Sequence, residues 1–314
     1  MNVLTKSADL AAGSKQLKKI TDGNVGQKRH WILHLIFILL CALFLYPVLL
    51  TIIVSFTDEA AIASNGYQII PEKWSLEGYR YAIQNAGILN AYKITIMSSV
   101  TGTFLSVMVM QMYAYPLSRK DFKHKNIFTY FAYFSTFLSG GLVPWYIVCT
   151  QVLNIGNTFW ALVLPSLMSP MYIIILRTFI SSNVHSEMLE AAKIDGPGEH
   201  RIFWQIVMPL SKPGLATISL FQLLAYWNDY YLPMMLITED SLYNLQYYLQ
   251  VMFQNIEILT SGIVGNNAAV NMADIPKEAT RMAMCVLTMG PILLVYPFFQ
   301  KYFVKGLTVG AVKG

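Results

Sequence analysis

The residues of this chain best suited to chemistry form a short aromatic and polar run, Trp227-Asn228-Asp229-Tyr230. Asp229 is the one carboxylate inside the long apolar segments described below, and burying a carboxylate among apolar groups costs at least a few kcal/mol unless it is hydrated or paired. Indole and phenol rings beside an amide can stack on and hydrogen-bond a sugar, which makes the run a candidate substrate path. The same rings can instead form the aromatic belt of a membrane surface. The sequence leaves both interpretations open.

Signatures of catalysis are missing from the sequence. No GxxxxGK followed by Ser or Thr occurs, so the chain lacks the phosphate-binding loop and lysine of ATP-binding proteins. The five histidines do not cluster and no HExxH is present, while the three cysteines share no metal-ligand spacing. We therefore predict no catalytic residue, no metal site and no cofactor in this chain.

The longest polar interruption in the second half of the chain is residues 190–209, EAAKIDGPGEHRIFWQIVMP. Ala191 and Ala192 favour a helix. Gly196 suits the left-handed position that ends a helix, and Pro197 suits the first turn of the next one. In the second helix one apolar stripe is predicted, made of Ile202, Phe203, Ile206 and Val207. Two short helices with an apolar underside and a charged tip are typical of a docking element, and we call residues 181–213 the elbow.

Composition identifies the surroundings of these sites. The 314-residue chain is 55% hydrophobic and 12% charged, whereas soluble domains carry about a quarter charged residues. Six apolar segments each reach the roughly 20 residues that a helix needs to cross a bilayer. They are residues 31–56, 89–115, 127–150, 158–180, 214–237 and 281–304. We predict an all-α membrane protein with six transmembrane helices in residues 31–314, preceded by a basic tail of residues 1–30.

The basic residues predict the orientation. Most of the 22 Lys and Arg residues fall in the tail, after the second segment, in the elbow and at the C-terminal end, which lie on one side in a six-span arrangement. Basic loops face the cytoplasm, so both termini and the elbow are expected there. Because the net charge of +5 follows this membrane asymmetry, we predict no nucleic-acid partner. The outward loops, 57–88 and 239–280, are acidic, and are either solvated connections or a docking surface for an extracellular protein.

The elbow resembles the EAA loop of permease subunits of ABC importers. That pattern is EAA, three residues, Gly, nine residues and Ile-x-Leu-Pro, and this chain departs from it only in Met208. The resemblance implies that the elbow contacts an ATPase. The residues implied in this coupling are Glu190, Ala191, Ala192, Asp195, Gly196, Ile206 and Pro209.

Further stretches look like those of carbohydrate-uptake permeases over roughly residues 32–314. They are AYPLSR at 114–119, GGLVPWY at 140–146, Trp227-Asn228, LQYYL at 245–249 and YPFFQKYFVKG at 296–306. The second and the last are most similar to the group that handles complex oligosaccharides, such as aldouronates and other polysaccharide fragments. Val184-His185-Ser186 departs from that group, which often has a proline before the elbow.

What this resemblance implies is a type I ABC importer transmembrane-domain fold in a bacterial cytoplasmic membrane. The chain would form half of a path for an oligosaccharide, paired with a second homologous permease subunit. Two ATPase subunits would hold the ATP and Mg²⁺, and an extracellular solute-binding protein would deliver the sugar. The alternatives are a permease for another solute class and a secondary transporter. A secondary transporter typically shows inverted repeats and ionisable residues near the membrane midplane.

Overall fold

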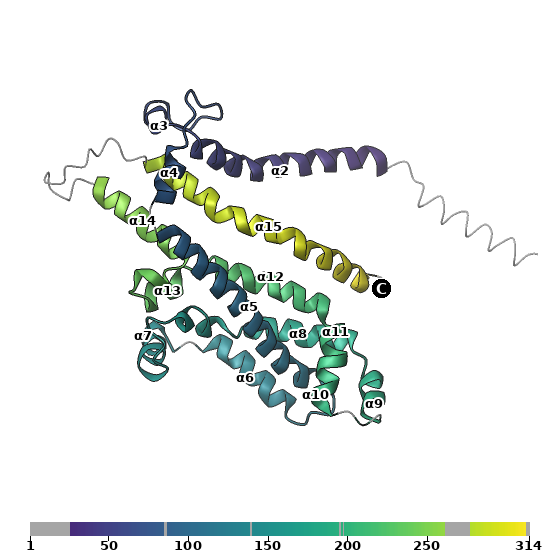
Figure 1. Cartoon of the computed structure of the whole chain (residues 1–314). Helices are drawn as coiled ribbons and strands as arrows, with labels where there is room; N and C mark the ends of the chain where they lie inside the picture. Colours follow the sequence, from purple (N-terminus) through teal and green to yellow (C-terminus); the bar gives the residue numbers. More distant parts are fainter. Residues whose placement is uncertain are drawn as a thin grey trace, which may run out of the picture.

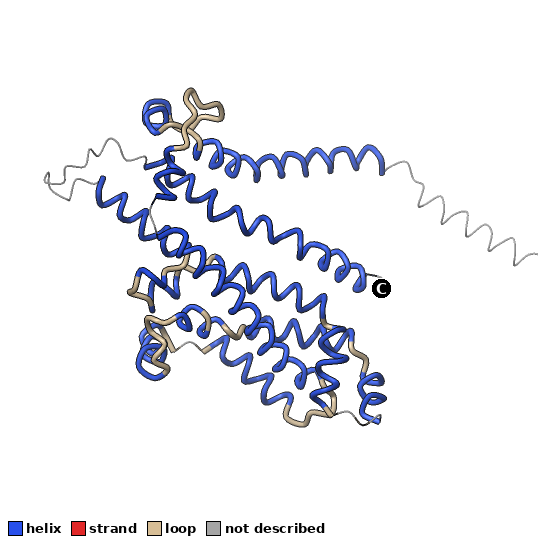
Figure 2. The backbone as a smooth tube through the Cα atoms, viewed as in Figure 1, coloured by secondary structure: helices blue, strands red, loops and turns tan. Residues whose placement is uncertain are grey.

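The computed structural model describes residues 26–84, 87–138, 140–194, 196, 198–260 and 277–311. Within those residues the fold is helical, and its only β pairing is a single bridge between Thr57 and Trp74. Most of the basic tail and residues 261–276 of the second outward loop lie outside the described residues, as do Asp195 and Pro197 of the elbow. Figure 2 shows the helices joined by short connections gathered at the ends of the molecule.

The α-helices, in chain order, are α2 (Gly26–Ser55), α3 (Glu59–Asn65), α4 (Glu77–Gln84), α5 (Gly87–Ser118), α6 (Lys125–Phe137), α7 (Leu142–Ile147), α8 (Pro170–Asn183), α9 (Ser186–Ile194), α10 (Glu199–Ile202), α11 (Met208–Leu210), α12 (Lys212–Trp227), α13 (Tyr231–Leu236), α14 (Leu245–Thr260) and α15 (Lys277–Ala311). Wider π-helical turns continue α7 at Val148–Val152 and α10 at Phe203–Val207. Tighter 3-10 turns occupy Phe159–Leu162, Leu164–Ser166 and Asp240–Leu242.

Among the described residues, three helices and three bent pairs of helical segments meet the length and hydropathy test for a membrane span. Helices α2, α5 and α15 each contain a stretch long and apolar enough to cross a membrane. Three pairs of shorter helical segments, Lys125–Phe137 with Leu142–Val152, Phe159–Ser166 with Pro170–Asn183, and Glu199–Leu210 with Lys212–Trp227, pass the same test together but are bent by more than 40°. The third pair joins residues 199–210, predicted as part of the elbow, to α12, whereas the predicted segment 214–237 corresponds to α12 and α13. The all-α fold with up to six spans agrees with the sequence prediction.

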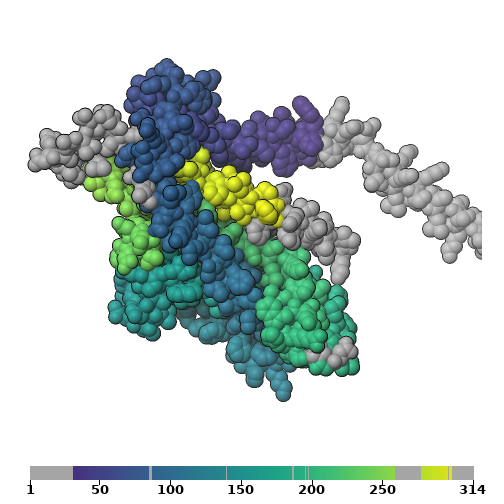
Figure 3. Space-filling view, in the orientation of Figure 1, coloured from purple at the N-terminus to yellow at the C-terminus, as the bar shows by residue number. Residues whose placement is uncertain are grey.

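Helix α5 is the centre of the bundle. It packs against α12 and α8, while α15 lies between α12 and α2 (Figure 1). Helix α2 lies at the edge with almost all of its apolar side chains exposed, and Figure 3 shows its purple surface standing clear of the rest along most of its length. An apolar helix with so little protein contact needs lipid or another subunit around it. The elbow lies at one end of the bundle, and α3 and α4 lie at the other (Figure 1).

Three predicted segments are interrupted. Residues 127–150 divide into α6 and the helical segment Leu142–Val152, which are bent by 114° relative to each other. Residues 158–180 begin as 3-10 turns, because Pro165 and Pro170 have no N–H to donate to a continuous helix. Carbonyls freed at this break are satisfied from α12: Tyr226 donates its hydroxyl to Val163 O at 2.9 Å, and Gln222 donates its amide to Ser166 O at 2.8 Å. Residues 214–237 are also broken, since α12 ends at Trp227 and α13 begins only at Tyr231.

Candidate functional site

The first arm of the elbow is α9, and it presents the EAA residues on two faces. Glu190 and Ala191 are exposed, whereas Ala192 is buried together with Leu189 against residues of α5 and α8. Positions three residues apart share one face of a helix, which is why 189 and 192 point the same way. The arm is therefore anchored on its inner face and leaves a carboxylate and a small side chain open on the outer one.

Gly196 lies between the two arms in a left-handed conformation, with φ of +88°. Its N–H donates to Lys193 O at 3.1 Å, which closes the end of the first arm. This matches the predicted role of the glycine. A Cβ atom at this position would meet nothing within 4 Å, so the constraint comes from the backbone alone.

The second arm runs from α10 through the π-helical turn into α11. Its predicted apolar stripe is confirmed: Ile202, Phe203 and Val207 are buried, and Ile206 packs at the edge of the same cluster. Trp204 faces outward instead. The arm meets α12 at a bend of 77°, with Pro209 in the short α11 just before it. Movement of the second arm therefore bears directly on α12.

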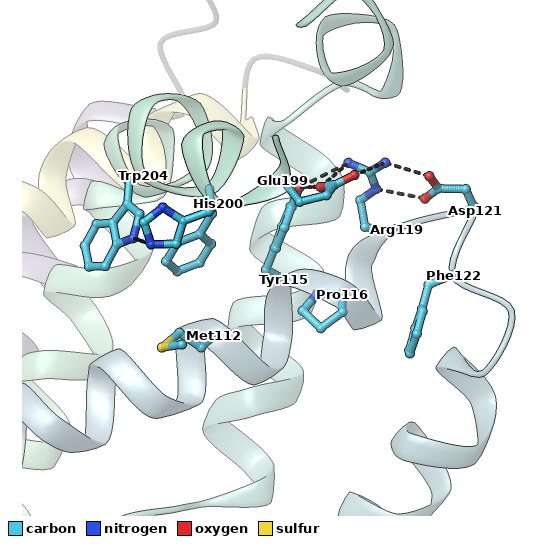
Figure 4. A pocket seen from close by; sticks show the side chains of 10 residues that line it. Met112, Tyr115, Pro116, Arg119, Asp121, Phe122, Glu199, His200 and Trp204 are labelled. Carbon is cyan, nitrogen blue, oxygen red and sulfur yellow. Dashed lines mark hydrogen bonds and ion pairs between the residues drawn. The ribbon is translucent and has the colours of Figure 1, made fainter. Parts of the chain in front are cut away.

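An ionic cluster joins both arms to the turn after α5. Figure 4 shows the part of it that is formed by Arg119, Asp121 and Glu199. Arg119 pairs with Asp121 at 2.6 Å and with Glu199 at 3.4 Å, and Lys193 reaches the same two carboxylates at 2.8 and 3.0 Å. The hydroxyl of Tyr115 donates to Glu199 at 2.7 Å. Hydrogen bonds from Arg119 and then Lys193 hold the pKa of the Asp121 carboxyl well below its ordinary value, so it stays charged at neutral pH.

Sequence reasoning did not find this cluster. Arg119 and Glu199 are 80 positions apart, and neither belongs to the EAA spacing. The only signal was the AYPLSR stretch, which ends at Arg119.

A cavity of about 550 Å³ adjoins the cluster, between the end of α5 and the second arm (Figure 4). Its walls are mostly apolar, and its charged or polar lining residues are Arg119, Asp121, Glu199 and His200. Trp204 closes one side and donates its indole N–H to His200 Nε2 at 3.0 Å. The apolar wall residues are Met112, Tyr115, Pro116, Phe122, Phe203 and Trp204.

The four residues of the candidate substrate path do not share one surface. Trp227 is buried, packs among Ile88, Ala91 and Leu245, and donates its indole N–H to Thr288 O at 3.3 Å. Its ring is thus part of the core of this subunit.

The other three members of the run lie at the break between α12 and α13. Asn228 and Tyr230 are exposed. Asp229 accepts hydrogen bonds from the N–H groups of Tyr231 at 2.9 Å and Leu232 at 3.2 Å, which satisfies the first turn of α13. The run lies at the opposite end of α12 from the elbow, so the structure contains two separate candidate sites.

Among the described residues, no group of three or more His, Cys, Asp or Glu side chains is placed to hold a metal ion.

A bundle of bent membrane helices with an elbow of EAA spacing defines the class of protein, the membrane subunit of an ABC importer. Residues 23–309 match the model of the family described as binding-protein-dependent transport system inner membrane component. The chain belongs to that family.

Two relatives from Bacillus subtilis (strain 168) align with most of the chain. Protein LplC is 34% identical over 273 residues, covering 87% of this chain and 90% of LplC. The polygalacturonan/rhamnogalacturonan transport system permease protein YtcP is 35% identical over 281 residues, covering 89% and 95%. A solved bacterial ABC transporter involved in the import of the acidic polysaccharide alginate superposes with a TM-score of 0.77 at 23% identity, covering 90% of this chain and 98% of that one, and shows the same fold.

Proposed function

We propose that this chain is the permease subunit of a carbohydrate ABC importer and forms half of the path for an oligosaccharide or polysaccharide fragment. The observation that carries the proposal is the elbow, with Glu190 and Ala191 open on one face and Ala192 anchored on the other. The sugar class is supported by the relatives, whose names specify transport of polygalacturonan or rhamnogalacturonan and, at 29% identity, of arabinooligosaccharides.

Its partners would be a second homologous permease, two ATPase subunits that bind ATP and Mg²⁺, and an extracellular solute-binding protein. Closure of the ATPases would move the elbow, and the second arm would pass that movement through its 77° bend to α12. Such coupling requires that the contacts between elbow and ATPase differ between the two states of the transporter.

In the proposed orientation the elbow and both termini face the cytoplasm of a bacterium, and the loops around α3, α4 and α14 face outward. Two observations support it. Of the described residues, the basic Arg119, Lys120, Lys123, Lys193 and Arg201 lie in the elbow and in the adjoining turn after α5. In Figure 1 the start of α2 and the end of α15 also lie at the end of the molecule that carries the elbow.

The test reverses one charge on the exposed face of α9. Glu190→Lys is expected to weaken ATPase binding roughly 30-fold, because losing one partner of a partly buried charge pair costs about 2 kcal/mol or more. The measurement is co-purification of the ATPase with the solubilised permeases, together with sugar transport. Glu239→Lys makes the same charge change at an exposed position of the opposite end of the molecule and serves as the control, with ATPase binding expected to stay at the wild-type level. If Glu190→Lys retains the ATPase at wild-type stoichiometry and transports normally, the elbow is not the coupling element.

The sugar class has its own test. Purified cognate solute-binding protein is titrated with a panel of oligosaccharides, including uronic-acid oligomers. Binding of a non-carbohydrate solute and of none of the sugars would contradict the carbohydrate assignment while leaving the coupling role of the elbow intact.

A further inference from the structure

The charged residues that join the elbow to α5 form a closed ring of alternating sign. Arg119 contacts Asp121 and Glu199, and Lys193 contacts the same two carboxylates. Each arm of the elbow contributes one member, Lys193 from the last turn of α9 and Glu199 from the start of α10. The other two members stand on the turn that follows α5. The ring therefore connects three elements at one point.

At the described positions of the turn between the arms, side chains make little contact that could fix its angle. Gly196 and Gly198 have no atom within 4 Å of where a Cβ would lie, and Ile194 is 86% exposed. With so little packing at these described positions, the angle between the arms depends on how each arm packs on the bundle and on polar contacts made beside the turn. Among the described residues, the ring supplies charged contacts that reach both arms at the turn.

Ordinary surface ion pairs contribute little, and the side chains of Asp121, Lys193 and Glu199 are 57%, 41% and 54% exposed, but Arg119 holds the ring at a buried position. The Arg119 side chain is only 10% exposed, and it donates to the Tyr115 hydroxyl at 3.1 Å as well as to the carboxylates. Tyr115 is itself buried, with its ring 5.5 Å from that of Phe203 in the second arm. The N–H donors of a guanidinium lie in one rigid plane. Hydrogen bonds to a buried phenol and to two carboxylates therefore hold the Arg119 side chain in one preferred orientation.

We propose that Arg119, Asp121, Lys193 and Glu199 form a clamp that fixes the angle between the two arms of the elbow, and that they act as positioning residues for coupling. Glu190 would then meet the ATPase from a preorganised arm. The coupling part of this inference rests on the proposed function, whereas the clamp itself is a property of this subunit alone.

The first test of the clamp measures the distance between the two arms and does not depend on ATP hydrolysis. Spin labels are placed on cysteines at Glu187 in α9 and Gln205 in the second arm, after replacement of the three native cysteines, in the assembled transporter. Pulsed electron–electron double resonance then gives the distribution of distances between the two labels, and hence between the arms. Arg119→Gln and Lys193→Gln are each expected to broaden this distance distribution. Arg119→Lys keeps the positive charge but loses the planar set of guanidinium donors, and should broaden the distribution less. Lys120→Gln, on the exposed neighbour, is the control and should leave the distribution unchanged.

Lys193→Gln keeps the test decisive if Arg119→Gln does not fold, because Lys193 is 41% exposed and lies outside the core. Unchanged distributions in both variants would overturn the clamp, whatever the ATPase does.

The second measurement is sugar transported per ATP hydrolysed in the full importer. It should fall roughly tenfold in Arg119→Gln, the size expected for losing hydrogen bonds to charged groups. Broadened distances with wild-type transport per ATP would overturn the positioning role. Failure of the proposed function shows instead as normal ATPase binding in Glu190→Lys, so the two failures are distinguishable.

Discussion

The ring of Tyr226 on α12 occupies the space that a side chain on Gly102 of α5 would need. A Cβ atom at Gly102 would lie 2.6 Å from the ring carbons of Tyr226, closer than real Cβ contacts. The ring cannot move aside freely, because its hydroxyl is hydrogen-bonded both to Val163 O and to Ser106. The glycine thus sets how closely the two central helices approach, and the tyrosine ties them to the broken fourth segment.

Gly102→Ala is expected to destabilise the protein. Overpacking costs about 1–3 kcal/mol, which outweighs the gain of up to about 1 kcal/mol from replacing glycine inside a helix. Gly290→Ala is the matched control, because Gly290 also lies inside a helix, α15, and a Cβ there would meet nothing within 4 Å. Thermal unfolding of the solubilised protein measures both. An equal midpoint in the two variants would show that α5 and α12 can separate at no cost.

Tyr226→Phe tests the hydrogen bonds separately from the packing. Removing the hydroxyl leaves Val163 O without its donor from α12, and we expect a loss of about 0.5–1.5 kcal/mol. Tyr130→Phe on α6, where the ring is 71% exposed, should change the unfolding midpoint little. A midpoint as high as wild type in Tyr226→Phe would mean that water or another donor replaces the hydroxyl.

Substitutions of Asp229 test whether its carboxylate caps helix α13 or acts as a charge on the substrate path. Its carboxylate accepts from the first N–H groups of α13, and asparagine can do the same without the charge. We therefore expect Asp229→Asn to fold and transport like wild type, and Asp229→Ala to lose about 1 kcal/mol of stability. The measurements are unfolding and sugar uptake. Loss of uptake in a well-folded Asp229→Asn would assign a function to the charge.

Local sequence signals predicted the elbow well because its determinants are local. The left-handed Gly196 and the stripe of Ile202 and Val207 follow from residue type and helical spacing within one short stretch. The ring of charged residues around Arg119 could not be predicted in this way, because it forms only when two segments 80 positions apart in the sequence meet.

The helix breaks escaped prediction for a related reason. By hydropathy, residues 158–180 and 214–237 are continuous apolar segments. A helix can break inside such a segment when the backbone carbonyl groups left without a partner accept hydrogen bonds from donor residues distant in sequence. Gln222 and Tyr226 supply those donors for the earlier segment. The burial of Trp227 is likewise decided by Leu245 and Thr288, which no local pattern links to it.

Single cysteines in a cysteine-free background test the proposed orientation. Lys123, on the turn after α5, is exposed at the elbow end, whereas Glu77 and Asp240 are exposed on the outward loops. An impermeant thiol reagent applied to intact cells should label positions 77 and 240 and leave position 123 unlabelled. Labelling at 123 alone would reverse the orientation.

Gly196 is expected to be the most demanding backbone position of the elbow. A side chain in the left-handed conformation costs roughly 1 kcal/mol, and asparagine tolerates it better than alanine. Because a Cβ at Gly196 meets nothing within 4 Å, this cost is conformational and not steric. Gly196→Ala should therefore weaken ATPase co-purification and transport more than Gly196→Asn does. Aspartate tolerates this conformation as asparagine does but adds a negative charge at the tip of the elbow. Gly196→Asp should therefore weaken ATPase co-purification more than Gly196→Asn through electrostatic repulsion if the docking surface is acidic there, and otherwise behave like Gly196→Asn.

Gly198→Ala controls for adding a methyl group two positions away. Gly198 has an ordinary φ of −66° and equally open surroundings, so its substitution should leave coupling near wild type. The membrane-embedded part should assemble in every variant, since neither glycine lies in the bundle. Equal coupling in Gly196→Ala and Gly198→Ala would mean that the elbow works without a left-handed turn, and that its two arms are oriented by the contacts of Arg119 and Glu199 alone.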